Sequence, residues 1–207
     1  MKSTEKSKLI DSFWNWFIQN QISCMKIIDA DETDLIDEVL INLVKIQRGL
    51  AVEFEKLKDK YVMTISADGI EDYFGIVQEI INRAPTLENW EFIAFRQPYG
   101  KEQVARITIN VSGFTLDPKQ IKFSPLIEDG NLYIQIFSAD INEETKNKIG
   151  YGCLMLLDNI IGEYNCVKMI SGFEYYNISE STGFSNKLKP LTEMREFIDS
   201  YYQMDKN

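Results

Sequence analysis

The sequence predicts an α+β fold, with two N-terminal helices, a mostly antiparallel sheet and a C-terminal helix. Apolar residues recur at helical spacing near both ends of the chain, and alternating, β-rich segments fill the middle. Two of these β-rich segments are also flanked by the same predicted elements in the same order. We expect a single domain over residues 1–207, because a chain of this length can bury one large core.

The first predicted helix covers residues 7–28 and has an unusually wide apolar surface. Two adjoining stripes together exceed the stripe of an ordinary surface helix. The first contains Ile10, Trp14, Ile18, Ile22 and Met25, and the second contains Leu9, Phe13, Trp16, Phe17 and Ile27. Because Trp14 and Trp16 lie about 200° apart, they face different surfaces. Core packing is the simpler interpretation of both tryptophans, and partner binding by an exposed tryptophan is the alternative.

An acidic segment at residues 29–34 leads into a second predicted helix, so that a helical part covers residues 1–48. Acidic side chains in a first turn complement the helix dipole. A calcium-binding loop is excluded, because Asp34 stands at the required glycine position and Leu40 at the last ligand position. We therefore expect no metal site here.

Two segments of the chain resemble one another. Residues 61–70 read YVMTISADGI and residues 133–141 read YIQIFSADI, and both contain Ser-Ala-Asp near their ends. Each follows a candidate strand and a turn, and each precedes a helix and another strand. This order predicts a duplicated strand–strand–helix–strand unit with hairpins, which favour antiparallel pairing. The predicted parts are the first unit at 49–98, a strand or hairpin at 99–118, the second unit at 119–178 and the C-terminal helix at 179–207.

The repeated Ser-Ala-Asp ends predict helix caps. Asp68 lies three residues before Glu71, and Asp140 lies three residues before Glu143. An acid at this position and a glutamate three residues later can satisfy amide donors of a first helical turn. A catalytic role is the alternative for Asp68, because strand ends commonly carry functional residues.

Several common sites are excluded by composition. The chain contains no histidine, which rules out Ser-His-Asp and Cys-His nucleophilic centres and the common zinc motifs. Gly150-Tyr-Gly152 does not continue as a dinucleotide motif, because the next glycine position holds Met155. We expect no cofactor and interpret these glycines as sites of close packing or bending. Cys24, Cys153 and Cys166 form no CxxC pair, which is typical of reduced, buried thiols.

The net charge of −10 limits the partners. Nucleic acid and anionic membranes are not expected, because binding them needs clustered lysine and arginine. No segment approaches the roughly 20 apolar residues that span a bilayer, and no signal peptide is evident. The remaining expectations are a cytoplasmic protein and either a basic protein partner or a homo-oligomer.

Carboxylates and one arginine are the remaining candidates for catalysis. Glu53 and Glu55 share one face of a predicted strand, and Arg96 lies at the end of another. Arg96 can hold a carboxylate or phosphate bidentately, or it can pair with Glu53 or Glu55 across the sheet. A hydrolase that uses Glu53, Asp68 and Arg96, with Mg²⁺ or Ca²⁺ if it needs a metal, is therefore one hypothesis. The favoured hypothesis is a non-catalytic binding protein that neutralises or regulates a basic partner.

Four segments together resemble an uncharacterised bacterial protein family, a domain of unknown function. They are FWNWF at 13–17, ISADGI at 65–70, AP-x-L-x-x-W at 84–90 with IAFR at 93–96, and LDNIIGEY at 157–164. The resemblance implies a soluble bacterial α+β protein with one integrated domain. It implies no activity, cofactor or catalytic residue.

Overall fold

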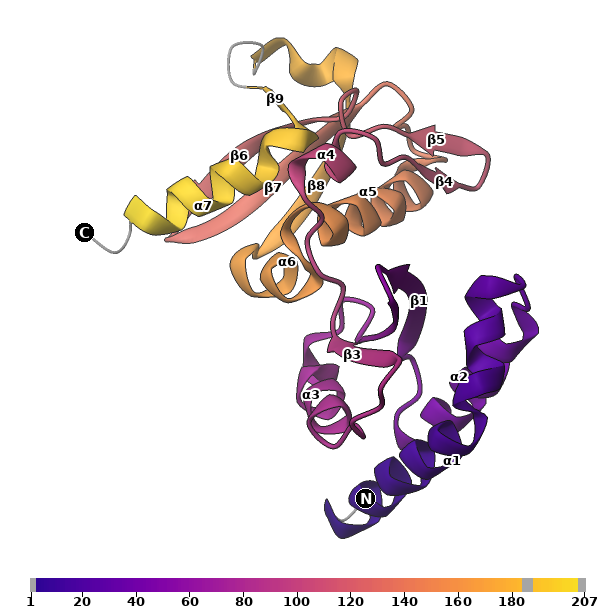
Figure 1. The fold of residues 1–207 in the computed structure, drawn as a ribbon. Helices are drawn as coiled ribbons and strands as arrows, with labels where there is room; N and C mark the ends of the chain where they lie inside the picture. The colour runs from indigo at the N-terminus through magenta and orange to yellow at the C-terminus, as the bar shows by residue number, and fades with distance from the viewer. Residues whose placement is uncertain (1–2, 184–187, 205–207) are drawn as a thin grey trace. The chain divides into compact units, whose positions relative to one another are not determined.

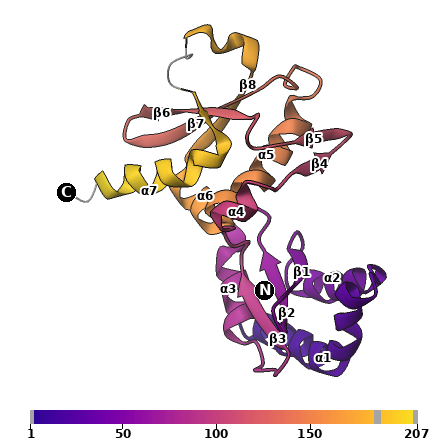
Figure 2. The same cartoon turned by 45° about the horizontal axis from the view of Figure 1, so that its top comes forward.

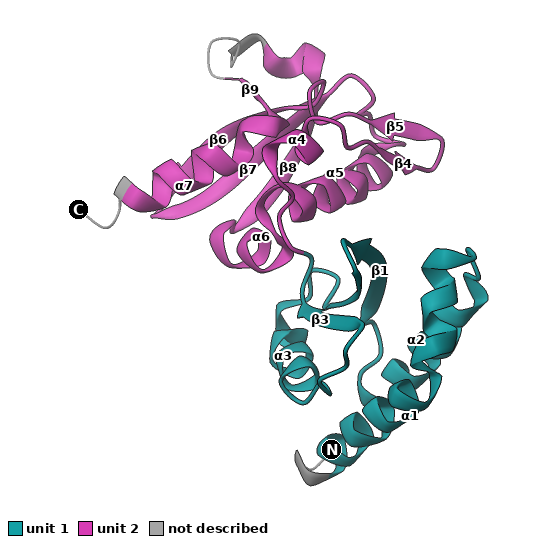
Figure 3. Ribbon diagram, viewed as in Figure 1, with its two compact units in different colours: residues 1–96 teal, residues 97–207 magenta. Residues whose placement is uncertain are grey.

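A computed structural model describes residues 3–183 and 188–204, and the chain forms two compact units, residues 1–96 and 97–207 (Figures 1 and 3). The predicted α+β class is confirmed, since two helices open the chain, a helix lies near its end and each unit has its own sheet. Four of the six strand pairings in the described part are antiparallel. The expectation of one domain stays a prediction.

The first unit contains two N-terminal helices and a three-stranded sheet, and a third helix connects the second and third strands of this sheet. Its elements are α1 (Ser3–Asp29), α2 (Asp34–Ile46), β1 (Ala51–Leu57), β2 (Lys60–Ser66), the short helix η1 (Glu71–Tyr73), α3 (Phe74–Asn82) and β3 (Trp90–Ala94). The strand order is β1-β2-β3, with β1 antiparallel and β3 parallel to β2. Figure 2 shows this sheet between α3 and the α1–α2 pair.

Both faces of the first sheet are therefore covered. Phe92 of β3 meets Trp14 and Phe17 of α1, with ring centroids 4.7 and 5.3 Å apart. On α3, Phe74 and Val77 are buried. The central strand β2 is buried over its last six residues, as expected for a strand covered on both sides.

The second unit contains a four-stranded sheet, a separate hairpin and several helices. Its elements are α4 (Lys101–Val104), β4 (Ile109–Val111), β5 (Phe114–Leu116), β6 (Lys122–Glu128), β7 (Asn131–Ser138), α5 (Lys146–Ile161), α6 (Glu163–Met169), β8 (Gly172–Asn177), η2 (Ile178–Gly183), β9 (Lys189–Pro190), η3 (Leu191–Glu193) and α7 (Met194–Met204). The strand order is β8-β7-β6-β9. The predicted intervening hairpin is β4–β5, which contacts α5.

The duplicated strand–strand–helix–strand order is present in both units. In each, an antiparallel hairpin is followed by a helical crossover and a third strand that lies parallel to the second. The registers also correspond, because Tyr61 pairs with Trp90 at the start of the parallel ladder and Tyr133 pairs with Gly172. The third strand makes each sheet mixed, since the helical crossover returns the chain to run parallel to the second strand.

The predicted helix caps at Asp68 and Asp140 are wrong. Helix α3 begins at Phe74, after a 3₁₀ turn, so Asp68 lies too far upstream to cap it. In the second copy, Asn142 Oδ1 accepts hydrogen bonds from the amides of Glu144 and Thr145, at 2.9 and 3.1 Å. The shared serine instead explains the repeat. Ser66 Oγ accepts from the Asp68 amide at 2.9 Å, and Ser138 Oγ accepts from the Asp140 amide at 3.3 Å.

Two predicted elements end earlier than their patterns indicate. The helix expected at 142–163 is interrupted at Gly162, where φ is 86°, and continues as α6. The strand expected from residue 167 therefore begins only at Gly172. The strand expected at 90–97 ends at Ala94, because Phe95 has a φ of 66°. In each case a left-handed backbone stops the regular element.

Candidate functional site

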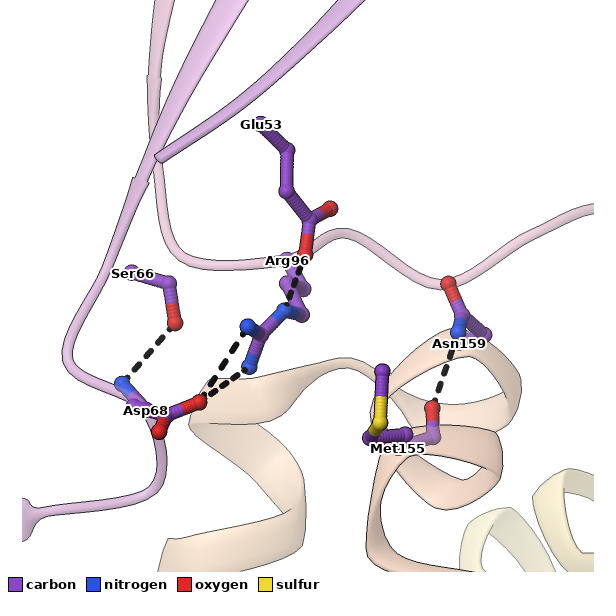
Figure 4. A network of polar contacts seen from close by, with 6 residues as sticks. All are labelled: Glu53, Ser66, Asp68, Arg96, Met155 and Asn159. Atoms are coloured by element: carbon purple, nitrogen blue, oxygen red, sulfur yellow. Dashed lines mark hydrogen bonds and ion pairs between the residues drawn. The ribbon is translucent and has the colours of Figure 1, made fainter. Parts of the chain in front are cut away.

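Glu53, Asp68 and Arg96 meet at one end of the first sheet (Figure 4). Asp68 follows β2 and Arg96 follows β3, and the carboxyl ends of these parallel strands lie at the same edge. Glu53 belongs to antiparallel β1 and pairs with Thr64 near that edge. The topology thus brings together three residues that the sequence analysis named without establishing their contact.

The arginine lies between the two carboxylates. Arg96 Nε donates to Glu53 Oε1 at 2.5 Å, and Nη1 and Nη2 both lie 3.2 Å from Asp68 Oδ1. The Arg96 side chain is only 10% exposed, whereas those of Glu53 and Asp68 are 50% and 39% exposed. The cation is therefore paired with two half-exposed anions of its own unit. This geometry favours the cross-sheet pairing over an open clamp for an external carboxylate or phosphate.

The backbone beside this cluster has an uncommon conformation. Phe95 and Asp68 have φ angles of 66° and 50°, in the left-handed region that non-glycine residues rarely adopt. The ring of Phe95 packs 4.6 Å from that of Phe74, and its amide donates to Ile65 O at 2.9 Å, and both contacts help to hold this conformation. Burial of the ring offsets the cost of the bend that precedes Arg96.

The cluster offers little to a carboxylate-based hydrolase. Such an enzyme needs a carboxylate that is available to a substrate, a water or a metal. Both carboxylates are instead bridged by one guanidinium. Over residues 3–183 and 188–204, no group of three or more Cys, Asp and Glu side chains is placed to hold a metal ion.

The two tryptophans of α1 lie on different surfaces, as their spacing indicates. Trp14 is 4% exposed, its indole Nε1 donates to Ile80 O at 2.8 Å, and it belongs to the core. Trp16 is partly exposed and stacks on Phe13, with ring centroids 6.5 Å apart. Of the two candidate binding residues, only Trp16 offers surface to a partner.

The most exposed apolar side chains of α1 and α2 are aliphatic. On α1, Ile18 and Ile22 are 40% and 74% exposed, and on α2, Ile41 and Val44 are 61% and 46% exposed. Spacings of four and three residues place each pair on one face of its helix. Each helix of the hairpin thus carries one exposed aliphatic pair, and we call the two pairs together the aliphatic surface of the hairpin. Ile18 and Ile22 belong to the first predicted stripe, whereas sequence reasoning missed the pair on α2.

Acidic residues surround the turn between these helices. They are Asp29, Asp31, Glu32, Asp34, Asp37 and Glu38. Asp37 and Glu38 lie four and three residues before Ile41, so they share its face of α2. Asp29 is fixed by hydrogen bonds from Tyr61 Oη and Lys56 Nζ, which lower the pKa of its carboxyl.

The three cysteines are free and buried. Burial raises the pKa of Cys24 to about 11 and that of Cys153 to about 12. Burial also raises the pKa of Cys166, next to Asp158. Thiols that stay protonated at neutral pH are poor nucleophiles. The free, buried state of all three agrees with the expectation of reduced, buried thiols.

No protein-family model, curated protein or solved structure matches the chain. The resemblance to an uncharacterised bacterial family stays a prediction. In the described part of the chain, no helix combines the length and the apolar character needed to cross a bilayer.

Proposed function

We propose that this protein is a binding protein that holds a basic partner protein on the α1–α2 hairpin and thereby neutralises or regulates it. The observation that carries the proposal is the aliphatic surface, above all Ile22, which is 74% exposed. Helix α1 already buries its opposite side in the core, through Phe13 and Phe17. Exposed apolar patches rimmed by polar residues are typical of surfaces that dock another protein.

The charges favour a basic partner. Asp37 and Glu38 stand beside Ile41 on α2, and further acids line the turn between the helices. Lysine and arginine of a partner would pair with this rim while its apolar side chains covered the aliphatic surface. The net charge of −10 would also speed the encounter with a positively charged protein.

A second copy of the chain fits this surface less well. Self-association would bring two acidic rims together, and like charges at an interface oppose binding. Catalysis by Glu53, Asp68 and Arg96 is also less well supported, because each carboxylate already pairs with the arginine.

Site-specific photocrosslinking tests the proposal. A benzophenone amino acid is placed at Ile22 or Ile41 in the cells that make the protein. The matched control is Ile127, an aliphatic residue of the second unit that is 55% exposed. We expect the amino acid at position 22 or 41 to form an adduct with one basic protein. The amino acid at position 127 should form no adduct with that protein.

The crosslinked protein is then purified and titrated with the native chain and with an Ile22→Ser/Ile41→Ser variant. We expect an affinity loss of about tenfold or more, since each lost aliphatic contact is worth about 1 kcal/mol. Equal affinity of the two forms, an acidic partner or an adduct with a second copy of the chain would each refute the proposal.

A further inference from the structure

The second unit contains a cavity that the proposed function does not use. Its volume is about 530 Å³, and its lining comes from the α4 region, α5, η3, α7 and the segment that joins β5 to β6. Helices α4, α5 and α7 lie together in Figures 1 and 2. Small-molecule sites in proteins commonly fall between roughly 300 and 1,000 Å³.

One side of the cavity is apolar and belongs to the core. Ile160 of α5 is fully buried and Val104 of α4 is 6% exposed, while Tyr99 and Ala105 flank them. Such a wall takes up a hydrocarbon or aromatic group by removing apolar surface from water.

Apart from Gly100 and Thr192, the rest of the lining is charged, and the sign of its net charge differs from that of the whole chain. It contains three cations, Lys101, Lys119 and Arg195, and two carboxylates, Glu196 and Asp199. The chain as a whole carries −10. Cations therefore outnumber carboxylates here, in a chain that is acidic as a whole.

The carboxylate of Glu196 is already paired. Lys101 Nζ lies 2.5 Å from Glu196 Oε1, and this contact lowers the pKa of Glu196. Arg195 makes a long bond, in which Nη1 donates to Tyr99 O at 3.5 Å. A guanidinium has five N–H donors in a planar fork, so this bond leaves donors that suit a carboxylate.

We infer that this cavity binds a small organic carboxylate with an apolar body, the anion at Arg195 and Lys119 and the body against Ile160 and Val104. The assignment is independent of the hairpin and of any protein partner. Asp199 would disfavour a ligand with a second negative charge, which restricts the class to monocarboxylates.

The test titrates the full-length protein with three probes of one shape: 3-phenylpropionate, 3-phenylpropan-1-ol and 3-phenylpropylamine. Binding is followed by ¹H–¹⁵N NMR. We expect the carboxylate to shift resonances around Ala105, Ile160 and Arg195, with a dissociation constant at least about tenfold below that of the alcohol. Equal binding of alcohol and carboxylate, tighter binding of the amine, or no shift at about 10 mM carboxylate would overturn the assignment.

Two variants locate the binding. Ala105→Phe fills the cavity from an exposed position, and Arg195→Gln removes the charged fork. We expect each to weaken carboxylate binding about tenfold, whereas Arg106→Gln, an exposed arginine outside the lining, leaves it unchanged. The spectrum of each variant reports whether it is folded. Unchanged binding by folded Ala105→Phe protein would place the ligand elsewhere and refute the inference.

Discussion

At the scale of single residues, the Arg96 cluster has the clearest structural role. The Arg96 side chain is 10% exposed and contacts two carboxylates, one on β1 and one directly after β2. Removing the arginine leaves Glu53 and Asp68 without their shared countercharge. Two carboxylates held at one sheet edge then repel each other.

We therefore expect Arg96→Ala to lower the free energy of unfolding by about 1–3 kcal/mol, with partial solvation of the carboxylates limiting the loss. Urea denaturation measures this change. Glu91→Gln, at an exposed acid of β3, is the control and should shift stability by less than about 0.5 kcal/mol. Equal effects of the two variants would contradict a structural role for Arg96.

A second residue-scale prediction concerns the pH dependence of stability. Hydrogen bonds from Tyr61 and Lys56 lower the pKa of Asp29 in the folded state. A lowered carboxyl pKa stabilises the fold above the unfolded-state value, about 4, and this contribution is lost as pH falls through the folded-state value. Asp29→Asn should thus be less stable than the native protein at pH 7, and the difference should shrink below about pH 4.

Urea midpoints measured between about pH 2 and pH 7 test this expectation. The control is Asp31→Asn, at an exposed acid two residues further along the chain. A deficit of Asp29→Asn that stayed constant over the whole pH range would argue against ionic stabilisation by Asp29.

At the scale of elements, small residues decide how closely helices and strands approach. Gly152 of α5 lies under the β4–β5 hairpin, where an added Cβ would stand 2.8 Å from Val111 Cγ1 and nearer still to Leu116 Cδ1. Gly150 lies similarly against the ring of Tyr175, since an added Cβ there would stand 3.1 Å from Tyr175 Cζ. The packing interpretation of these glycines is thus supported by their neighbours.

We expect Gly152→Ala to destabilise the protein by about 1–3 kcal/mol, because overpacking outweighs the gain in helix propensity. Gly75→Ala is the matched control. Gly75 lies in α3, where an added Cβ would meet no atom within 4 Å apart from its chain neighbours and the backbone of its own helix, and the same change there should stabilise by up to about 1 kcal/mol. Thermal unfolding of both variants tests the contrast, and equal destabilisation would rule out the steric explanation.

Periodicity predicted most elements but not their ends. Repeating apolar residues located α1, α2 and the paired strands, because burial of one face produces that pattern. The positive φ of Phe95 depends on its packing against Phe74, which is distant in sequence, so the early end of β3 left no local signal. The helix cap at Asp68 was mispredicted because two structures give the same sequence pattern. An aspartate follows a strand both in a helix cap and in a turn closed by a serine hydroxyl, and the structure contains the turn at Ser66.

The sequence predicted which residues form the candidate site, but it did not predict how their charges pair. Alternation and strand ends identified Glu53, Asp68 and Arg96, but only the strand order shows that one arginine bridges both acids. Helical spacing grouped Ile18 and Ile22 with Trp14, yet which part of a wide stripe stays exposed depends on what packs against the helix.

At the scale of the whole molecule, each unit has its own sheet and core. The first unit comprises residues 1–96 and buries both faces of its sheet. Domains with their own core commonly fold alone. We expect residues 1–96, produced as a separate chain, to unfold in one cooperative urea transition. A non-cooperative transition with exposed apolar surface would show instead that the two units form a single folding domain, as the sequence predicts.

The central claim at this scale is that the α1–α2 hairpin binds a basic partner protein. Native mass spectrometry of protein purified gently from its own cells, in the native form and as Ile22→Ser/Ile41→Ser, tests it most directly. We predict a stoichiometric complex of the native chain with one basic protein, and its loss in the variant. The same complex in both forms, or a bare chain in both, would contradict the account.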